Sequence, residues 1–162
     1  SKDYQAEFKA IFEKETLFDD PTVYIHISSK VAKEDSPDGC ENWFILINAP
    51  ANSGQDWDAL IEACRRNVIQ KINRVLGINL EDYIVAEDYL DPRRIESRTS
   101  SAGGALYGNS SNNKFAAFLR HPNYRAAIKN MYWIGGSVHP GGGIPLCLSS
   151  AKIAAKLFQE NA

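Results

Sequence analysis

The chain has 162 residues, of which 44% are hydrophobic and 10% aromatic, enough to build a buried core in one domain. Eighteen basic and twenty acidic residues give a formal net charge of −2. The basic residues form no stripe, which argues against a nucleic-acid-binding protein. No apolar run reaches the length of a membrane-spanning helix. The three cysteines are odd in number and widely spaced, which argues against a disulfide framework and predicts a cytoplasmic protein.

The first fifty residues predict a helix followed by two strands. Tyr4, Phe8, Ile11 and Phe12 recur at helical spacing and indicate an amphipathic helix over residues 3–16. Residues 23–27 alternate between apolar and polar side chains, as in a strand with two different faces. Residues 43–47 are apolar on both faces, which predicts a central strand. We expect these two strands to form an antiparallel hairpin with a long connection.

The next predicted element is a long helix. Asp56 is placed to cap its N-terminus and Gly77 to close its C-terminus. Between them, apolar residues recur on one face. Residues 83–86 predict a short third strand, which Asp91 and Pro92 would end.

The remainder of the chain predicts a loop, a strand and a helix. Residues 93–114 are small, polar and rich in Gly and Ser, so from composition they could form either a linker or an ordered loop. Residues 132–138 predict a strand and residues 144–159 a helix. Pro145 suits the first turn of that helix, where its missing amide proton costs nothing.

Three consecutive glycines, at positions 141–143, stand between this strand and helix. Glycine allows close backbone approach and positive φ angles. Together with a positive helix N-terminus, such a turn can hold a flat or anionic ligand. Glycine spacing alone leaves two interpretations open: a ligand-binding loop, and a tight connection without a ligand.

Four segments strongly resemble the C-terminal end of bacterial-type phytoene desaturases. These are FAD-dependent carotenoid desaturases related to the amine-oxidase flavoproteins. The four segments are 103–108 (GGALYG), 118–125 (FLRHPNYR), 128–132 (IKNMY) and 132–146 (YWIGGSVHPGGGIPL). Residues 17–26 (LFDDPTVYIH) and 36–42 (SPDGCEN) also look like substrate-domain strands of that family. The resemblance therefore covers nearly the whole chain, and its most specific part runs from His139 to Pro145.

The resemblance implies that a loop near the C-terminus contacts FAD. The amides around Gly143 and Ile144, with the helix dipole, would face the flavin N1/C2 carbonyl, where reduced flavin is anionic. Gly135, Gly136 and Ser137 would lie nearer the ribityl and phosphate part. The implied cofactor-binding residues are Gly135, Gly136, Ser137, His139, Pro140, Gly141, Gly142, Gly143, Ile144 and Pro145.

Other residues keep two interpretations. His139 could act in catalysis, but a brace for the turn is the simpler role, because hydride transfer to flavin needs no histidine. Arg120 and Arg125 could contact FAD phosphates, close the cavity or form ordinary ion pairs. Aromatic residues could line a polyene channel or simply pack in the core; they are Tyr24, Trp43, Phe44 and Tyr107. We assign no catalytic residue and no metal ligand.

Family members hold the FAD pyrophosphate with a G-x-G-x-x-G turn, and this chain has none. We therefore expect a C-terminal piece of a larger enzyme, inactive alone and unable to retain FAD. The resemblance predicts an α+β fold, with a mixed, largely antiparallel sheet covered by helices, plus the terminal strand and helix of a discontinuous Rossmann-like FAD domain. Residues 1–100 would belong to the substrate domain, 101–130 to a crossover and 131–162 to the FAD domain.

The function implied by the resemblance is dehydrogenation of a polyene by hydride transfer to flavin. The substrate would be a carotenoid or another apolar polyene, which implies contact with a membrane surface. One alternative is a related flavoprotein that saturates or isomerises another isoprenoid. Another is that the isolated chain is a non-catalytic binding or interaction module.

Overall fold

A computed structural model describes residues 1–108 and 120–161 of the chain. The chain divides into two compact units, Ser1–Arg94 and Ile95–Ala162, and each is described by itself. The boundary lies close to the predicted end of the substrate-domain portion at residue 100. The assignment of segments to substrate, crossover and FAD domains stays a prediction. Part of the predicted Gly/Ser-rich segment, residues 109–114, lies outside the described residues.

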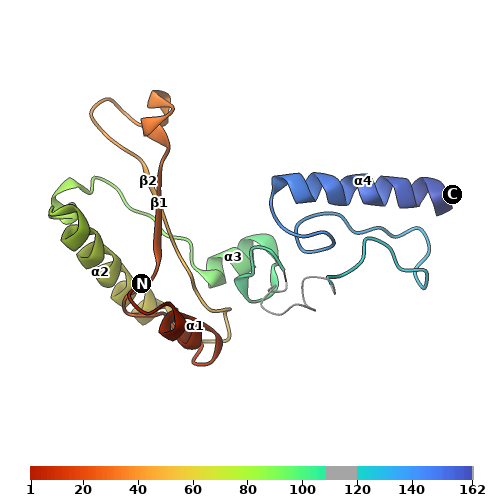
Figure 1. Cartoon of the computed structure of the whole chain (residues 1–162), viewed down its shortest axis with the longest axis horizontal. Coiled ribbons are helices and arrows are strands. Elements are labelled where there is room, and N and C mark those ends of the chain that lie inside the picture. The colour runs from red at the N-terminus through yellow and green to blue at the C-terminus, as the bar shows by residue number, and fades with distance from the viewer. Residues whose placement is uncertain (109–119, 162) are drawn as a thin grey trace. The chain divides into compact units, whose positions relative to one another are not determined.

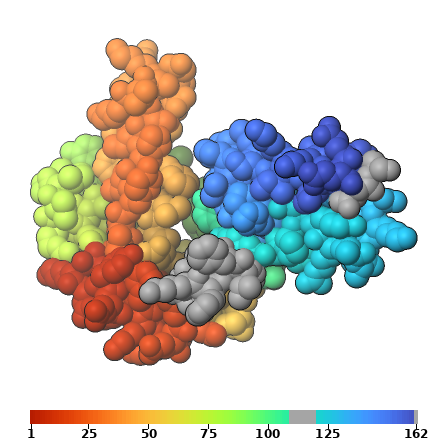
Figure 2. Space-filling view, turned by 45° about the vertical axis from the view of Figure 1, so that its right-hand side comes forward, coloured from red at the N-terminus to blue at the C-terminus, as the bar shows by residue number. Residues whose placement is uncertain are grey.

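The first unit contains two longer helices and a hairpin, in the predicted order (Figure 1). Helix α1 (Tyr4–Phe12) is followed by strands β1 (Val23–Ile27) and β2 (Trp43–Ile47) and then by helix α2 (Trp57–Leu76). The strands pair antiparallel, with Ile25 opposite Ile45, so the predicted hairpin is confirmed. Its long connection carries two short 3-10 turns, Ser28–Lys30 and Lys33–Asp35. Figure 2 shows this connection, in orange, standing out from the unit.

Helix α2 begins and ends where the sequence predicts. The Asp56 side chain accepts a hydrogen bond from the Ala59 amide at 3.1 Å, the usual N-cap arrangement. Gly77 closes the helix in the left-handed conformation, with φ of 68°. The face that α2 buries is apolar, as expected from its periodicity; its buried residues are Trp57, Val68, Ile69 and Ile72.

A buried glutamate ties α1 to the ends of both strands. Glu7 is 1% exposed. Its carboxylate accepts hydrogen bonds from the Thr22 hydroxyl at 2.6 Å and the Thr22 amide at 3.0 Å, and one from Asn48 Nδ2 at 3.3 Å. Thr22 precedes β1 and Asn48 follows β2. Burial works against ionisation, but the hydrogen bonds from Thr22 and Asn48 outweigh it and hold the pKa of Glu7 below its ordinary value.

The aromatic side of α1 is the exposed side. Tyr4, Phe8 and Phe12 are 56%, 37% and 53% exposed, and their rings contact one another in a row, with centroids 4.7 and 5.4 Å apart. The buried residues of α1 are instead Glu7, Ala10 and Ile11. Helical spacing therefore predicts the helix correctly and assigns its buried face only in part, because Glu7 takes a place in the interior.

Two strand predictions in the first unit need correction. Strand β2 was expected to be central, but β1 is its only partner among residues 1–108 and 120–161, and Phe44 and Leu46 are exposed. The predicted strand at residues 83–86 is wrong. Leu80–Tyr83 forms a 3-10 turn, and residues 84–86 are irregular. Asn73 Oδ1 accepts the Leu80 amide at 2.8 Å, which bonds the start of this turn to α2.

The second unit is mainly helix and irregular loop. Helix α3 (Pro92–Thr99) contains the boundary between the units, and a 3-10 turn follows at Ala102–Gly104. Asp91 and Pro92 thus begin a helix, where the sequence pattern predicted the end of a strand. Helix α4 (Ile144–Asn161) confirms the predicted C-terminal helix. None of the helices in the described part of the chain is long and apolar enough to cross a membrane.

The predicted strand at residues 132–138 is wrong. This stretch makes two isolated bridges, Tyr124 with Tyr132 and His121 with Val138. Gly135 lies between them with φ of 126°, a conformation that breaks the regular strand geometry. The chain therefore passes from one neighbour to another without forming a continuous ladder.

Replacing Glu7 with Gln should lower the free energy of unfolding by about 1–3 kcal/mol at pH 7, because an amide group cannot accept all the hydrogen bonds that the carboxylate accepts. The folded-state pKa of Glu7 is lowered, so its contribution is fully present above its ordinary value of 4.5 and is lost as the pH falls through the folded-state value. Urea unfolding should show the difference between wild type and variant narrowing at acid pH. Glu13→Gln, at an exposed site, is the control, and an equal effect of both substitutions would contradict the assignment.

Candidate functional site

The predicted site residues lie in one loop and the start of the helix that follows it. We call residues 134–143 the glycine loop. Gly135, Gly141 and Gly143 have φ angles of 126°, 137° and 97°, so the expected positive φ values are confirmed. The Cys147 amide donates to the Gly143 carbonyl at 2.9 Å. Gly143 therefore immediately precedes the first turn of α4, and Pro145 lies in that turn as predicted.

Two buried side chains, the amide of Asn123 and the hydroxyl of Ser150, anchor the glycine loop through hydrogen bonds. Asn123 is 3% exposed and Ser150 is 0% exposed. Asn123 Nδ2 lies 2.9 Å from the Trp133 carbonyl, 3.0 Å from the His139 carbonyl and 2.8 Å from Ser150 Oγ. The Gly135 amide also donates to Ser150 Oγ, at 3.2 Å. One amide group thus connects Trp133, just before the loop, and His139, within it, to Ser150 in α4.

The sequence analysis did not single out Asn123 or Ser150. Asn123 follows a proline in a polar segment, and Ser150 is one of several small residues in a helix, so neither stands out by type or spacing. Only the quoted segment FLRHPNYR, which contains Asn123, pointed to its neighbourhood. Their role depends on burial and on contacts between distant parts of the chain, and a local pattern contains neither.

Protein groups cover two of the glycines to different degrees. A Cβ on Gly142 would lie 2.3 Å from Tyr107 Cδ1, which is an overlap. A Cβ on Gly141 would lie 3.3 Å from Arg120 Cζ, a tight contact with a flexible side chain, so the φ of 137° is what requires glycine there. The guanidinium of Arg120 also donates to the carbonyls of Tyr107 at 3.0 Å and Gly136 at 3.3 Å. Arg120 therefore braces the glycine loop through backbone oxygens, and the phosphate contact and ion pair considered from sequence stay predictions.

The start of α4 has an open side. An added Cβ on Gly143 would meet no heavy atom within 4 Å, and Ile144 is 78% exposed. The first amides of a helix carry partial positive charge and lack acceptors within the helix. The positive φ of Gly143 and this open space allow a flat group to approach the backbone closely. This geometry suits the flat ring that the family resemblance implies here, and the flavin contact stays a prediction.

His139 braces the loop through its backbone. Its amide donates to the His121 carbonyl at 2.9 Å, and its carbonyl accepts from Asn123, while the residue itself is exposed. His139 also lines a cleft of about 310 Å³, together with Arg120, Pro122, Asn123, Tyr124 and Leu157. The sequence predicted a brace made by the His139 ring, whereas the bonds described above are made by the backbone of His139, so a role for the ring stays a prediction.

The aromatic residues considered for a polyene channel do not form a closed core. Tyr24, Phe44 and Tyr107 are 55%, 59% and 60% exposed, and Trp43 is half-buried. Core packing therefore does not account for the first three, and a role in polyene binding stays a prediction. The described ranges contain no group of three or more His, Cys, Asp or Glu side chains arranged to hold a metal ion.

The chain is similar along nearly its whole length to carotenoid desaturases. It is 57% identical to the 1-hydroxycarotenoid 3,4-desaturase of Flavobacterium sp., over 98% of this chain and 32% of the relative. It is 31% identical to the phytoene desaturase of Neurospora crassa, over 99% of this chain and 28% of the relative. A 4,4'-diapophytoene desaturase of Methylomonas sp. is 32% identical, over 99% of this chain and 32% of the relative.

These similarities confirm the resemblance to carotenoid desaturases. The chain spans about a third of the length of the curated relatives that it matches, which fits a portion of such an enzyme. No protein-family model matches the chain.

Gly142→Ala should destabilise the second unit by roughly 1–3 kcal/mol, because the new methyl group overlaps the Tyr107 ring. The φ of Gly142 is not in the left-handed region, so the alanine fits the backbone and only its volume is costly. In a Tyr107→Ala background most of this cost should disappear. Thermal unfolding of the wild type, the two single variants and the double variant measures the coupling, and an unchanged cost in the Tyr107→Ala background would refute the contact.

Asn123→Asp should loosen the glycine loop at neutral pH, because a carboxylate would replace a donor that faces two carbonyls and a hydroxyl. Burial among acceptors should raise the pKa of the new carboxyl group. Stability should therefore recover in part as the pH falls and the group becomes protonated. Hydrogen exchange of the amides of residues 133–139 at pH 7 and pH 5 measures this. Asn130→Asp, at an exposed site, should show neither effect.

Proposed function

We propose that this chain is the C-terminal portion of an FAD-dependent carotenoid desaturase. The observation that carries the proposal is the similarity of nearly the whole chain to such enzymes, at 57% identity in one case. The open start of α4, beside Gly143 and Ile144, supports it. The rest of the enzyme would supply the dinucleotide-binding fingerprint that this chain lacks.

For the substrate, we propose a hydroxylated carotenoid that loses hydrogen at its 3,4 position. The identity of 57% with a 1-hydroxycarotenoid 3,4-desaturase is well above the 30–32% found with relatives named for other carotenoid reactions. Two of those relatives are named as oxygenases. The product must therefore be identified to decide between removal of hydrogen and addition of oxygen.

The residues of this chain would hold one part of the cofactor. When bound, FAD would supply the hydride acceptor for the reaction. The Gly143 and Ile144 amides and the positive end of α4 would stabilise negative charge on the nearby part of the ring. Gly135 also has open space beside it, consistent with a place near the ribityl chain together with Ser137. Gly141 and Gly142 would serve indirectly, by allowing Arg120 and Tyr107 to pack against the loop.

A direct test uses the full-length protein that contains this chain, produced in cells that accumulate an acyclic 1-hydroxycarotenoid. We expect the purified protein to contain flavin and the extracted pigment to lack a pair of hydrogens relative to its precursor, as measured by mass spectrometry. A pigment that gains oxygen would replace the desaturase proposal with an oxygenase. A full-length protein that never takes up FAD would overturn the cofactor assignment.

The isolated chain should behave differently from the full-length protein. We propose that it takes up no FAD by itself, and that contact with a membrane surface belongs to the whole enzyme. Absorbance spectroscopy of the purified chain after incubation with FAD and gel filtration tests the first point. Stoichiometric flavin in the protein peak would show that this portion is sufficient for binding.

Ile144→Asp in the full-length enzyme should slow flavin reduction about tenfold, equivalent to about 1.4 kcal/mol. The new carboxylate would oppose the negative charge that the site is proposed to stabilise. Because acidic residues are favourable in the first turn of a helix, the substitution should not unfold α4. Ile144→Asn introduces a side chain of nearly the same size as aspartate but without the charge. This variant should retain most of the wild-type rate of flavin reduction. Stopped-flow measurement of flavin bleaching by substrate distinguishes the two, and equal rates would exclude an electrostatic role for this position.

A further inference from the structure

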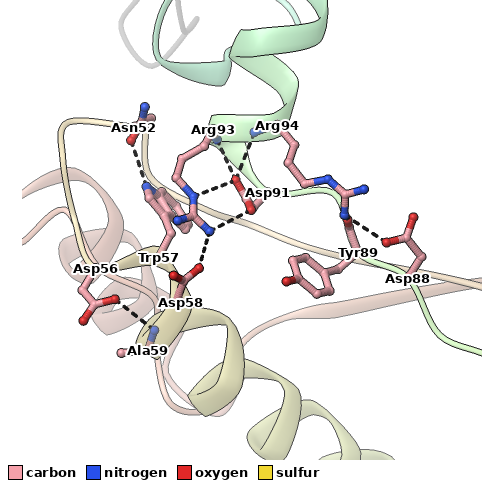
Figure 3. Close-up of polar contacts among 10 residues, drawn as sticks. All are labelled: Asn52, Asp56, Trp57, Asp58, Ala59, Asp88, Tyr89, Asp91, Arg93 and Arg94. Carbon is pink, nitrogen blue, oxygen red and sulfur yellow. Dashed lines mark hydrogen bonds and ion pairs between the residues drawn. The ribbon is translucent and has the colours of Figure 1, made fainter.

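Helix α3 begins in a cluster of charged residues that the proposed function does not use (Figure 3). Asp91 stands immediately before the helix, Arg93 lies in its first turn, and Asp58 lies in the first turn of α2. The Arg93 guanidinium reaches both oxygens of Asp91, at 3.3 and 3.2 Å, and Asp58 Oδ1 at 2.7 Å. This arrangement joins the starts of two helices through one arginine.

Helix α3 needs such support because it is short and polar. It has eight residues, Pro92–Thr99, and isolated helices of this length are not stable in water. The Asp91 carboxylate caps it by accepting the Arg93 amide at 2.7 Å and the Arg94 amide at 3.1 Å. Pro92 follows at the first helical position, where proline is favoured. The cap defines where the helix begins, but it does not fix the helix against a neighbour.

The guanidinium of Arg93 holds the start of α3 against α2. The Asp91 side chain is 4% exposed, and a charge pair shielded from water is stronger than an exposed one. Burial disfavours the charged form of Asp91, but the hydrogen bonds from Arg93 and Arg94 outweigh burial and hold its pKa below the ordinary value. The Asp58 side chain is 82% exposed, so this partner adds little stability. Its effect is geometric, because it ties the outer side of the guanidinium to α2.

The other end of α3 is bonded to the chain that follows it. Glu96 Oε1 accepts the Gly103 amide at 2.9 Å, and the Glu96 carbonyl accepts the Ser100 amide at 2.8 Å. The division between the two units falls within this helix, between Arg94 and Ile95. The connection between the units is therefore a capped helix, fixed at its start by Arg93 and at its end by Glu96.

We propose that Asp91, Arg93 and Asp58 form a clamp that keeps α3 helical and holds its start against the start of α2. The clamp concerns the chain itself and can be tested without cofactor or substrate.

Hydrogen exchange of the Ile95, Glu96, Ser97 and Arg98 amides tests the clamp in the 162-residue chain. Arg93→Gln should accelerate their exchange about tenfold or more, through local opening of the helix. Asp58→Asn, at an exposed site, should have a smaller effect in the same direction without unfolding the protein. The matched control is Glu62→Gln, which removes an exposed carboxylate of α2 that pairs with Arg66 at 3.7 Å, within that helix. Unchanged α3 exchange in Arg93→Gln, or equal effects of Asp58→Asn and Glu62→Gln, would overturn the clamp.

Discussion

The structure around the candidate site depends on one buried amide group. Asn123 Nδ2 lies within hydrogen-bonding distance of the carbonyls of Trp133 and His139 and of the Ser150 hydroxyl. Trp133 and His139 lie on either side of the turn that contains Gly135, and Ser150 lies in α4. Because buried polar groups are costly when they lack partners, these bonds determine a single arrangement of loop and helix. The loop can then be irregular, with no strand to support it, and still present the same backbone amides.

Within this arrangement, glycines serve two different physical purposes. At position 142 a side chain would overlap the Tyr107 ring, so glycine is needed for packing. At position 141, where φ is 137°, glycine is needed for the backbone conformation. At position 143 the surroundings are open and φ is 97°, so glycine is needed for the backbone conformation and for access from outside. A run of three identical residues therefore combines a structural requirement with the one feature that fits a flat ligand. This combination explains why glycine spacing alone could not decide between a ligand-binding loop and a tight connection.

The first unit combines a hydrogen-bonded interior with exposed aromatic side chains. Glu7 connects α1 to the ends of both strands through Thr22 and Asn48, while Tyr4, Phe8 and Phe12 form an exposed row. Such exposed apolar surface is uncommon on a protein that functions alone. It agrees with a chain that spans about a third of the length of its carotenoid desaturase relatives.

The sequence by itself determined the elements that depend on local chemistry. The periodicity and caps of α2, the alternation in β1 and the position of Pro145 in α4 follow from interactions within a few residues, and the motif from His139 to Pro145 indicated the type of protein. Tertiary structure decided what depends on distant neighbours. It placed Asn123 and Ser150 beneath the glycine loop, Arg120 beside Gly141 and Arg93 between two aspartates. It also replaced two predicted strands that have strand-like composition. Tyr83 ends a 3-10 turn and residues 84–86 are irregular, while residues 132–138 make isolated bridges in place of a continuous ladder. A hydrogen bond between residues that are far apart in the sequence produces no periodic sequence pattern, because its two partners become neighbours only in the folded protein.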